Sequence, residues 1–281
     1  MERKPLQIDI QSEIGQLNAV LLHTPGAEVE NMTPKMAQRA LYSDILNLSI
    51  AQEEYKQLSG VLSKIANVYT VTDLLVKVLE NPVEREELVK KICVTENVME
   101  YYETLMEMSS VRLAKALIEG LPARINTLTS FLNEDYYALF PLYNFYFTRD
   151  AAVTIGNHAL ICKMANKVRM RESLIMQAIY KGSGEFACGI IDAYDHSPLN
   201  PNLFMEGGDI LIAREDVLLI GNGIRTSSQG IDFLASRLSA IAPQGHRHII
   251  VQQLPHTPES FIHLDMVFTM LDRNKCMVFE P

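Results

Sequence analysis

The chain has 281 residues, 48% of them hydrophobic and 21% charged, a composition typical of an ordinary globular protein. Its formal net charge of −9 and its lack of a basic run argue against nucleic acid as a partner. The N-terminus leads into no apolar signal segment and no stretch approaches membrane-spanning length, so we expect a cytoplasmic protein with no membrane partner. The four cysteines form no metal-type or redox pair, which fits reduced thiols: Cys93, Cys162, Cys188 and Cys276.

The N-terminal part of the chain mixes strands with helices. The apolar run from Leu17 to His23 predicts a buried strand that Thr-Pro-Gly closes. Helices are expected over 34–46 and 49–65, followed by a short strand over 68–71.

The pattern changes after residue 72. Short amphipathic helical segments follow one another to about residue 130 without a strand signal, and Pro82 suits the first turn of one of them. We therefore predict an inserted all-helical subdomain over 72–135, within a propeller domain formed by 1–71 and 136–281.

An internal repeat occupies the rest of the chain. Three predicted hairpins each begin with an aspartate, at Asp150, Asp209 and Asp265. Helices over 171–180 and 231–241 follow the first two hairpins, and a strand over 248–251 follows the second helix. The repeated unit is strand-strand-helix-strand, which buries its faces only by packing against copies of itself around an axis. Equivalent aspartates should then lie near that axis.

The third repeat ends directly after its hairpin, at Glu280-Pro281. A ring needs its last module, so the sequence predicts a C-terminally truncated form of a longer protein. The edge left open should expose apolar surface, which favours association of copies into a homo-oligomer.

Several acidic side chains and one imidazole stand where the repeats begin. We expect Gly207 and Gly208 to turn the Glu206 side chain into a cleft, because glycine permits positive φ and close backbone approach. His263 and Asp265 are two positions apart in an expected strand and should point the same way. Buried carboxylates are costly unless they are paired, so a cation should occupy the space between them. A planar guanidinium suits two carboxylates, and a divalent metal is the competing occupant.

These motifs resemble those of the arginine deiminases, in the guanidine-modifying superfamily. Residues 144–150 are similar to the family's Asn-x-x-Phe-Thr-Arg-Asp, 206–209 to its Glu-Gly-Gly-Asp, and 263–268 to its His-Leu-Asp-x-Val-Phe. Residues 221–230 resemble a further stretch that carries a substrate-binding arginine. The resemblance implies the pentein fold, a five-bladed α/β propeller of ββαβ modules that is incomplete here. It also implies a helical insert of the kind that distinguishes arginine deiminases.

The activity implied by the resemblance is hydrolysis of free L-arginine to L-citrulline and ammonia, without metal or organic cofactor. A cysteine thiolate would attack the guanidinium carbon and form a covalent intermediate. The resemblance assigns roles by position. Asp150 and Asp265 would bind the guanidinium, Glu206 would add a hydrogen bond, and His263 would act as general acid and then as base. Arg225 would pair with the substrate carboxylate, Arg169 (with Arg171 its near rival) would be a second carboxylate contact, and Asn144 and Phe147 would line the alkyl chain and amine.

The family's nucleophilic cysteine lies near the C-terminus in a Gly-rich segment, and this chain stops before it. Cys276 sits on the returning strand of a hairpin, where the resemblance places an ordinary core residue. We therefore expect this chain to be inactive by itself. The alternatives are a non-catalytic arginine-binding relative and another guanidine-modifying enzyme: an amidinotransferase, a dimethylarginine hydrolase or an agmatine deiminase. A metal hydrolase is the least favoured, because a single histidine is a poor metal signature.

Overall fold

The structure is a computed structural model, and it describes residues 4–30, 46–132, 136–195, 200–241, 248–257 and 261–279. The chain forms two compact units. Unit 1 consists of Met1–Gln16, Arg149–Ser173 and Gly184–Pro281, and unit 2 of Leu17–Thr148 and Leu174–Ser183. The predicted division into a propeller domain and a helical insert has other boundaries than these two units, and it stays a prediction. No helix within the described part of the chain is long and apolar enough to cross a membrane.

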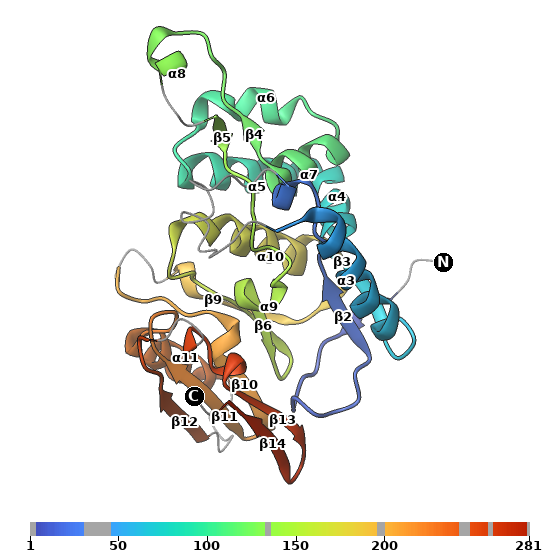
Figure 1. The fold of residues 1–281 in the computed structure, drawn as a ribbon, viewed down its shortest axis with the longest axis vertical. Coiled ribbons are helices and arrows are strands. Elements are labelled where there is room, and N and C mark those ends of the chain that lie inside the picture. Colours follow the sequence, from blue (N-terminus) through green and yellow to red (C-terminus); the bar gives the residue numbers. More distant parts are fainter. Residues whose placement is uncertain are drawn as a thin grey trace. The chain divides into compact units, whose positions relative to one another are not determined.

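Unit 1 is built mainly from short strands, most of them visible in Figure 1. Its elements are β1 (Leu6–Gln7), β6 (Ala152–Ile155), β7 (His158–Ile161), η2 (Lys167–Arg169), β8 (Phe186–Ala187), β9 (Gly189–Asp192), η4 (Gly207–Asp209), β10 (Ile210–Arg214), β11 (Val217–Asn222), α11 (Ser228–Ile241), β12 (His248–Gln253), η6 (Leu264–Met266), β13 (Phe268–Asp272) and β14 (Lys275–Val278), where η marks a 3-10 helix. Two helices contain boundaries between the units: α9 (Thr148–Ala151) and α10 (Met170–Gly182).

Two modules of unit 1 have the strand-strand-helix-strand order that the repeat predicts. In the first, β6 pairs antiparallel with β7, and β7 pairs parallel with β9 after α10. In the second, β10 pairs antiparallel with β11, and β11 pairs parallel with β12 after α11. The predicted module order is confirmed in both, and the fold is mixed α/β. The closure of five such modules into a ring stays a prediction.

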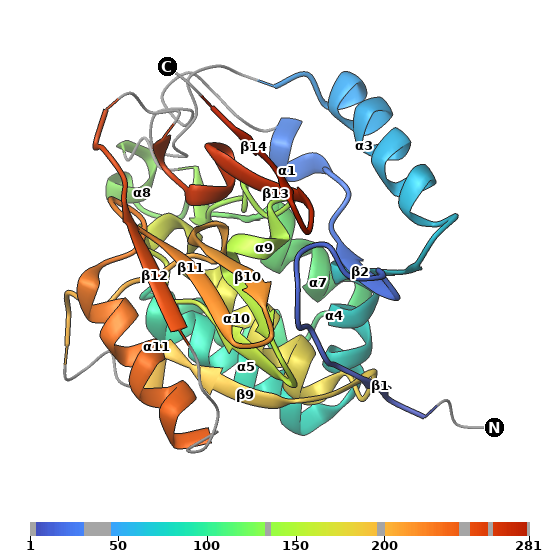
Figure 2. The ribbon, with the colours of Figure 1, turned by 90° about the horizontal axis from the view of Figure 1, so that it is seen from below.

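The second module shows how its sequence produces these elements. The apolar run at the start of β10 is buried, and β11 buries Leu218 and Ile220 at alternate positions, as expected for a strand with one covered face. Helix α11 begins after Ser227, whose hydroxyl accepts the backbone N–H of Gly230 at 3.1 Å, a typical N-cap contact. Figure 2 shows α11 beside the sheet formed by β10, β11 and β12.

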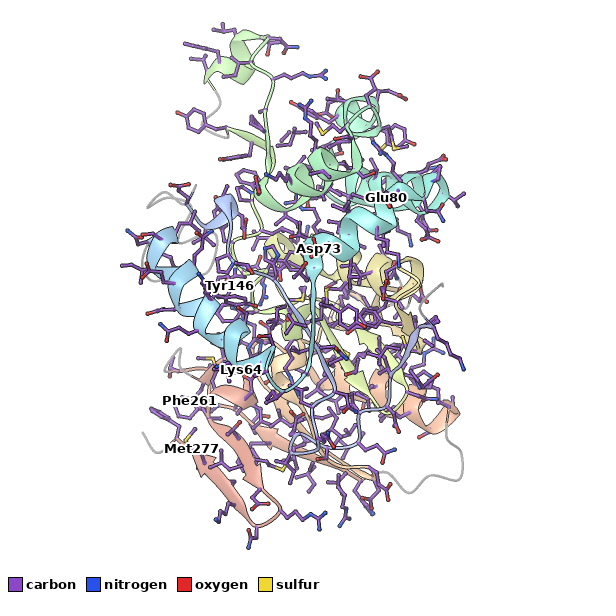
Figure 3. The ribbon with its side chains drawn as sticks, turned by 90° about the vertical axis from the view of Figure 1, so that its right-hand side faces the viewer. Lys64, Asp73, Glu80, Tyr146, Phe261 and Met277 are labelled. Carbon is purple, nitrogen blue, oxygen red and sulfur yellow. The ribbon has the colours of Figure 1, made fainter. Side chains whose placement is uncertain are left out.

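The third hairpin begins later than predicted. Strand β13 pairs antiparallel with β14, but Leu264–Met266 forms η6 and is not part of the strand. Both strands expose large apolar side chains, among them Leu271 and Met277, the second of which is labelled in Figure 3. These exposed side chains fit the expected apolar edge, and the homo-oligomer stays a prediction.

Unit 2 contains a cluster of helices and two short sheets. Its elements are β2 (Ala19–Leu22), α1 (Ala27–Glu30), α3 (Leu48–Leu62), β3 (Asn67–Thr70), α4 (Val71–Glu80), α5 (Pro82–Thr95), η1 (Met99–Tyr101), α6 (Tyr102–Met106), α7 (Ser110–Glu119), β4 (Leu121–Pro122), α8 (Leu128–Leu132) and β5 (Tyr137–Leu139). Strands β2 and β3 pair in parallel and are mostly half-buried. Helix α4, whose Asp73 and Glu80 are labelled in Figure 3, packs on α5 and α7 through buried aliphatic side chains.

The structure bears on some of the predictions for this unit and corrects one of them. Pro82 is the first residue of α5, as predicted, and the Asn81 side chain accepts the Val83 N–H at 3.0 Å. The stretch predicted to be purely helical also contains β4, which pairs with β5. Two residues are too few to show strand periodicity, so the sequence carried no signal for it. Residues 34–45 of the helix predicted over 34–46 lie outside the described residues.

Candidate active site

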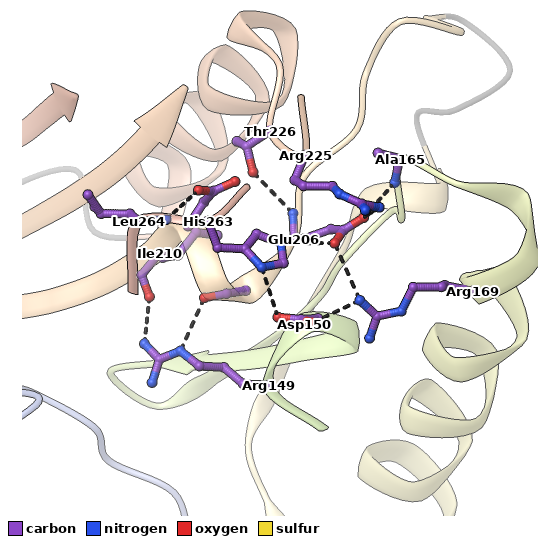
Figure 4. A network of polar contacts seen from close by, with 12 residues as sticks. Arg149, Asp150, Ala165, Arg169, Glu206, Ile210, Arg225, Thr226, His263 and Leu264 are labelled. Carbon is purple, nitrogen blue, oxygen red and sulfur yellow. Dashed lines mark hydrogen bonds and ion pairs between the residues drawn. The ribbon is translucent and has the colours of Figure 1, made fainter. Parts of the chain in front are cut away.

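Three buried titratable side chains meet in unit 1, at the entrances of the hairpins (Figure 4). Asp150 is 7% exposed, Glu206 0% and His263 5%. Nε2 of His263 lies 3.0 Å from Oε2 of Glu206, and Nδ1 lies 3.8 Å from Oδ1 of Asp150. A carboxylate accepts hydrogen bonds only, so Nε2 of His263 carries the hydrogen of the shorter contact. We call Asp150, Glu206 and His263 the core triad. The predicted convergence of these three residues is confirmed.

The two glycines after Glu206 allow this close approach. A Cβ atom on Gly208 would lie 2.8 Å from Cγ of His263 and 2.9 Å from Oδ1 of Asp150, and one on Gly207 would lie 2.0 Å from the carbonyl oxygen of Arg149. Any side chain would therefore separate members of the core triad. Positive φ was the other expected reason for glycine, but neither residue is among the described glycines with positive φ. Close packing alone explains the pair.

Arg149 fixes the same turn from the other side. Its Nε donates to the carbonyl oxygen of Gly207 at 3.1 Å, and its Nη2 donates to that of Ile210 at 2.6 Å. The guanidinium also pairs with the Glu13 carboxylate, at 2.7 Å for the shorter contact. The side chain of Arg149, the residue before Asp150, is thus hydrogen-bonded to the backbone on both sides of Asp209. Sequence reasoning missed Glu13 and Arg149, because the partners are 136 positions apart and no local pattern joins them.

Arg169 supplies the cation that the buried carboxylates require. Its Nη1 donates to Oδ2 of Asp150 at 2.8 Å and lies 3.5 Å from Oε2 of Glu206, while Nε and Nη2 donate to the Glu172 carboxylate. Arg169 is 4% exposed, and these contacts raise its pKa further although burial alone would lower it. An internal guanidinium therefore occupies the kind of position predicted for a substrate guanidinium. Arg169 therefore lies at the core triad, and its rival Arg171 is buried as well.

Glu206 is held at both carboxylate oxygens. Oε1 accepts the backbone N–H of Ala165 at 3.1 Å and lies 3.7 Å from Nη1 of Arg225, while Oε2 faces His263 and Arg169. The side chain of Arg225 is 12% exposed, so this arginine lies at the border between cluster and solvent. Arg225 and Arg169 together place two positive charges beside Glu206. Their predicted contacts with a substrate carboxylate stay predictions.

The charges of this network shift proton affinities in opposite directions. Burial alone would lower the pKa of His263, but its hydrogen bond to Glu206 and the charges of Asp150, Glu206 and Asp209 outweigh burial and raise it. Burial alone would raise the pKa of Glu206, but His263 and Arg169, with Arg225, outweigh it and lower it. The network therefore favours an imidazolium ion bonded to a carboxylate, which is a proton donor held next to the cluster.

Asp265 does not share a face with His263, contrary to the prediction. His263 is extended and buried, but Asp265 lies in η6 and is exposed. A 3-10 helix advances one third of a turn per residue, so the alternation of a strand does not apply. Loss of hydration at the cluster still raises the pKa of Asp265, and the charge of Asp150 adds to the rise. Leu264 and Val267 anchor η6 in an apolar cluster that also contains Leu211 and Leu254. Asp265 is therefore a carboxyl group at the open side of the site.

Asp209, the remaining acid of the predicted set, is buried and points to the backbone of η6. Its Oδ1 accepts the N–H of Leu264 at 2.9 Å. The other two predicted site residues, Asn144 and Phe147, belong to unit 2, where Asn144 is buried and Phe147 is exposed. Their contact with a substrate stays a prediction.

The cysteines are poorly suited to act as a nucleophile at the core triad. Cys162 is fully buried, and burial together with the charges of Glu206 and Asp150 holds its pKa well above the usual range. Burial also raises the pKa of Cys93 to about 11 and that of Cys188 above its usual value. Cys276 is exposed on β14 and lies opposite Met270. A reactive thiol needs a lowered pKa, which the first three do not have.

The core triad also has the composition of a small cation site. One ligand atom from each of its members lies within 4.8 Å of the others. A metal ion there would face the guanidinium of Arg169, which already pairs with Asp150 and lies near Glu206. The site therefore favours an organic guanidinium, which can share the carboxylates through directed N–H donors, over a second compact positive charge.

Comparison with known proteins identifies a family and a fold that this chain resembles. The sequence profile of the arginine deiminase family matches residues 38–281. The chain is 32% identical over 283 aligned positions to an arginine deiminase of Staphylococcus aureus (strain JH9), an alignment that spans 95% of this chain and 68% of the relative.

Two solved structures resemble the fold. The N-terminal domain of ArgZ, an arginine dihydrolase of cyanobacteria solved with its product, has a TM-score of 0.54 and 17% identity over 93% of this chain and 66% of that chain. The DDAH of Pseudomonas aeruginosa, solved with citrulline, has a TM-score of 0.52 and 14% identity over 94% of this chain and 70% of that chain. At these identities the likeness concerns the fold alone.

Proposed function

This chain belongs to the arginine deiminase family of the guanidine-modifying superfamily, and on that premise we propose that the complete protein hydrolyses L-arginine to L-citrulline and ammonia through a covalent cysteine intermediate. One observation carries the proposal. The imidazole of His263 is buried against Glu206 and next to Asp150, with its pKa raised. Such a group supplies a proton to a departing amine, as ammonia release requires.

The carboxylates bind the substrate's guanidinium. Asp150 and Asp265 accept its N–H groups, because a planar guanidinium offers donors that match carboxylate oxygens. Binding requires Arg169 to release the Asp150 oxygen that it now occupies at 2.8 Å. Arg169 then joins Arg225 at the substrate's carboxylate, and Asn144 and Phe147 line its alkyl chain and amine.

The reaction has two stages. A cysteine thiolate forms a bond to the guanidinium carbon, the bond from this carbon to one terminal nitrogen breaks, and His263 gives its proton to the leaving ammonia. His263 then takes a proton from water as the water oxygen bonds to the same carbon. The carbon–sulfur bond breaks, and citrulline and the thiolate are released. One water is consumed for each ammonia formed.

The nucleophile, in this proposal, comes from a part of the protein outside these 281 residues. Three of the four cysteines present have raised pKa values, and the fourth is exposed on a hairpin strand. We infer that the chain alone does not turn over arginine. The same observation favours a second candidate, a relative that binds arginine without turnover.

The direct test measures citrulline released from L-arginine by the product of the complete reading frame. The proposal expects turnover, trapping of a covalent adduct on one cysteine in mass spectra after acid quench, and loss of turnover in His263→Asn. Asp232→Asn, on the exposed face of α11, is the matched control and should keep full activity. Agmatine and methylated arginines serve as competing substrates. Faster turnover of one of these would replace the arginine assignment, and binding of arginine without turnover would establish the second candidate.

A further inference from the structure

Asp209 is a buried acid that the proposed chemistry does not use. It is 0% exposed, and burial raises its pKa to about 7 although His263 and a hydrogen bond from Thr226 act in the opposite direction. Burying a carboxyl group costs stability unless its contacts compensate. The contacts of Asp209 therefore indicate what the residue contributes.

The main contact of Asp209 caps a helical turn from a distance. Leu264 is the first residue of η6, and the first N–H groups of a helix have no acceptor within it. The usual acceptor is the side chain of the preceding residue, but that residue is His263, which makes no capping hydrogen bond. Oδ1 of Asp209 accepts the Leu264 N–H instead, at 2.9 Å and 55 positions away.

Neighbouring residues hold the Asp209 carboxylate in this position. A Cβ atom on Gly221 of β11 would lie 2.4 Å from Oδ1 of Asp209. The Leu264 side chain is buried with Leu211 and Leu254, so both its backbone and its side chain are fixed. His263, one residue earlier, can then hold its ring between Gly208 and Glu206.

We propose that Asp209 is a positioning residue, which holds the start of η6 through the Leu264 amide and thereby keeps Nε2 of His263 on Glu206. The inference rests on the proposed function only for the role of His263 as proton donor. It adds to that function a second layer of the site, in which the last acid of the Glu-Gly-Gly-Asp motif acts on the backbone and never touches substrate.

The test follows the His263 imidazole by NMR in the ¹⁵N-labelled chain without arginine. Asp209→Ala removes the acceptor, so the slowly exchanging N–H signal of the bond to Glu206 should disappear and the pKa of His263 should fall by about one unit or more. Asp209→Asn keeps an amide oxygen that can accept the Leu264 N–H, so the N–H signal should persist. Asp216→Asn, at a half-buried aspartate on the neighbouring turn, is the control and should leave His263 unchanged.

Comparison of the two variants separates position from charge. Asp150, Glu206, Asp209 and Asp265 are the acids around His263, and Arg169 and Arg225 are the cations beside Glu206. Asp209→Ala and Asp209→Asn both remove one negative charge, so an equal effect of the two on His263 would overturn the positioning role. Retention of the Glu206 bond in Asp209→Ala would overturn it as well.

Gly221→Ala provides a test that retains the carboxyl group. The added methyl group should displace Oδ1 of Asp209, weaken the Leu264 hydrogen bond and lower the pKa of His263. An unchanged His263 in this variant contradicts the proposal even if Asp209→Ala does not fold. All these measurements are independent of turnover, so an inactive complete protein would refute the proposed function and leave this inference standing.

Discussion

The entrances of the first and second hairpins begin with the same residue type and differ in almost every contact. Asp150 pairs with the guanidinium of Arg169 and faces His263, whereas Asp209 accepts the backbone N–H of Leu264. Both are buried, but burial raises the pKa of Asp209 to about 7 and outweighs the opposing effect of His263. At the third entrance, Asp265 is exposed.

The difference shows what a repeat determines. Equivalent positions bring three aspartates to one region, but the neighbours of each decide whether it carries charge, supports the backbone or faces solvent. Each experiment below changes one of these environments.

The largest effect is expected from Asp209→Asn, as a function of pH. The pKa of Asp209 rises on folding from 3.8 to about 7, so wild-type stability should fall, relative to the asparagine variant, as the pH rises between these values. Between pH 4 and pH 8 the stability of the wild type relative to the variant should fall by about 4 kcal/mol, at about 1.4 kcal/mol per unit of pKa. Urea unfolding at pH 4 and pH 8 measures this, and equal midpoint differences at the two pH values would contradict it.

Asp150→Ala tests the hairpin entrance at which an arginine offsets the charge of the aspartate. The variant leaves Nη1 of Arg169 without its closest carboxylate, and breaking one side of a buried pair costs about 3 kcal/mol. We place the loss at this lower end because Arg169 keeps Glu172. Thermal or urea unfolding at pH 7 measures it. A loss no larger than that caused by replacing an exposed aspartate such as Asp232 would show that the pair contributes little.

Arg149→Lys tests the clamp beside Asp150. Lysine keeps the charge but not the forked donors that reach Gly207, Ile210 and Glu13 together. We expect a loss of about 2 kcal/mol, the value of one hydrogen bond to a charged group. The unfolding midpoint measures the loss, and Glu13→Gln should give a similar one. Full stability in both variants would show that the contacts of Arg149 with Glu13, Gly207 and Ile210 do not stabilise the fold.

Asp265→Asn should have the smallest effect on stability. Replacement of an exposed side chain such as that of Asp265 changes the free energy of unfolding by no more than about 0.5 kcal/mol. Binding of arginine should nevertheless weaken about tenfold, as calorimetry can measure, because a charged hydrogen bond is worth about 1.5 kcal/mol or more. A large loss of stability with unchanged arginine binding would contradict this assignment, because Asp265 would then support the fold, as Asp150 does, and would not bind substrate.

The sequence predicted the features that recur, and missed those that depend on distant partners. Alternating apolar residues and turn residues located the hairpins opened by Asp150 and Asp209. The repeat also predicted that Glu206 and His263 lie close together. No local pattern could indicate that Arg149 reaches Glu13, or that Arg169 lies on Asp150. The faces of His263 and Asp265 were mispredicted because one 3-10 turn replaces the expected strand. Asp209 looked like its repeat equivalents, and only the position of the Leu264 amide distinguishes it.

The most direct test of the central claim, that the core triad is a guanidinium site, is a titration of the ¹⁵N-labelled chain with L-arginine. The account predicts a saturable change in the His263 imidazole signals, and in the Nε signal of Arg169 as the substrate takes its place on Asp150. Asp150→Asn should abolish the change, and Asp216→Asn should preserve it. Signals of His263 that stay fixed up to high arginine concentration, or that move equally in Asp150→Asn, would contradict the claim.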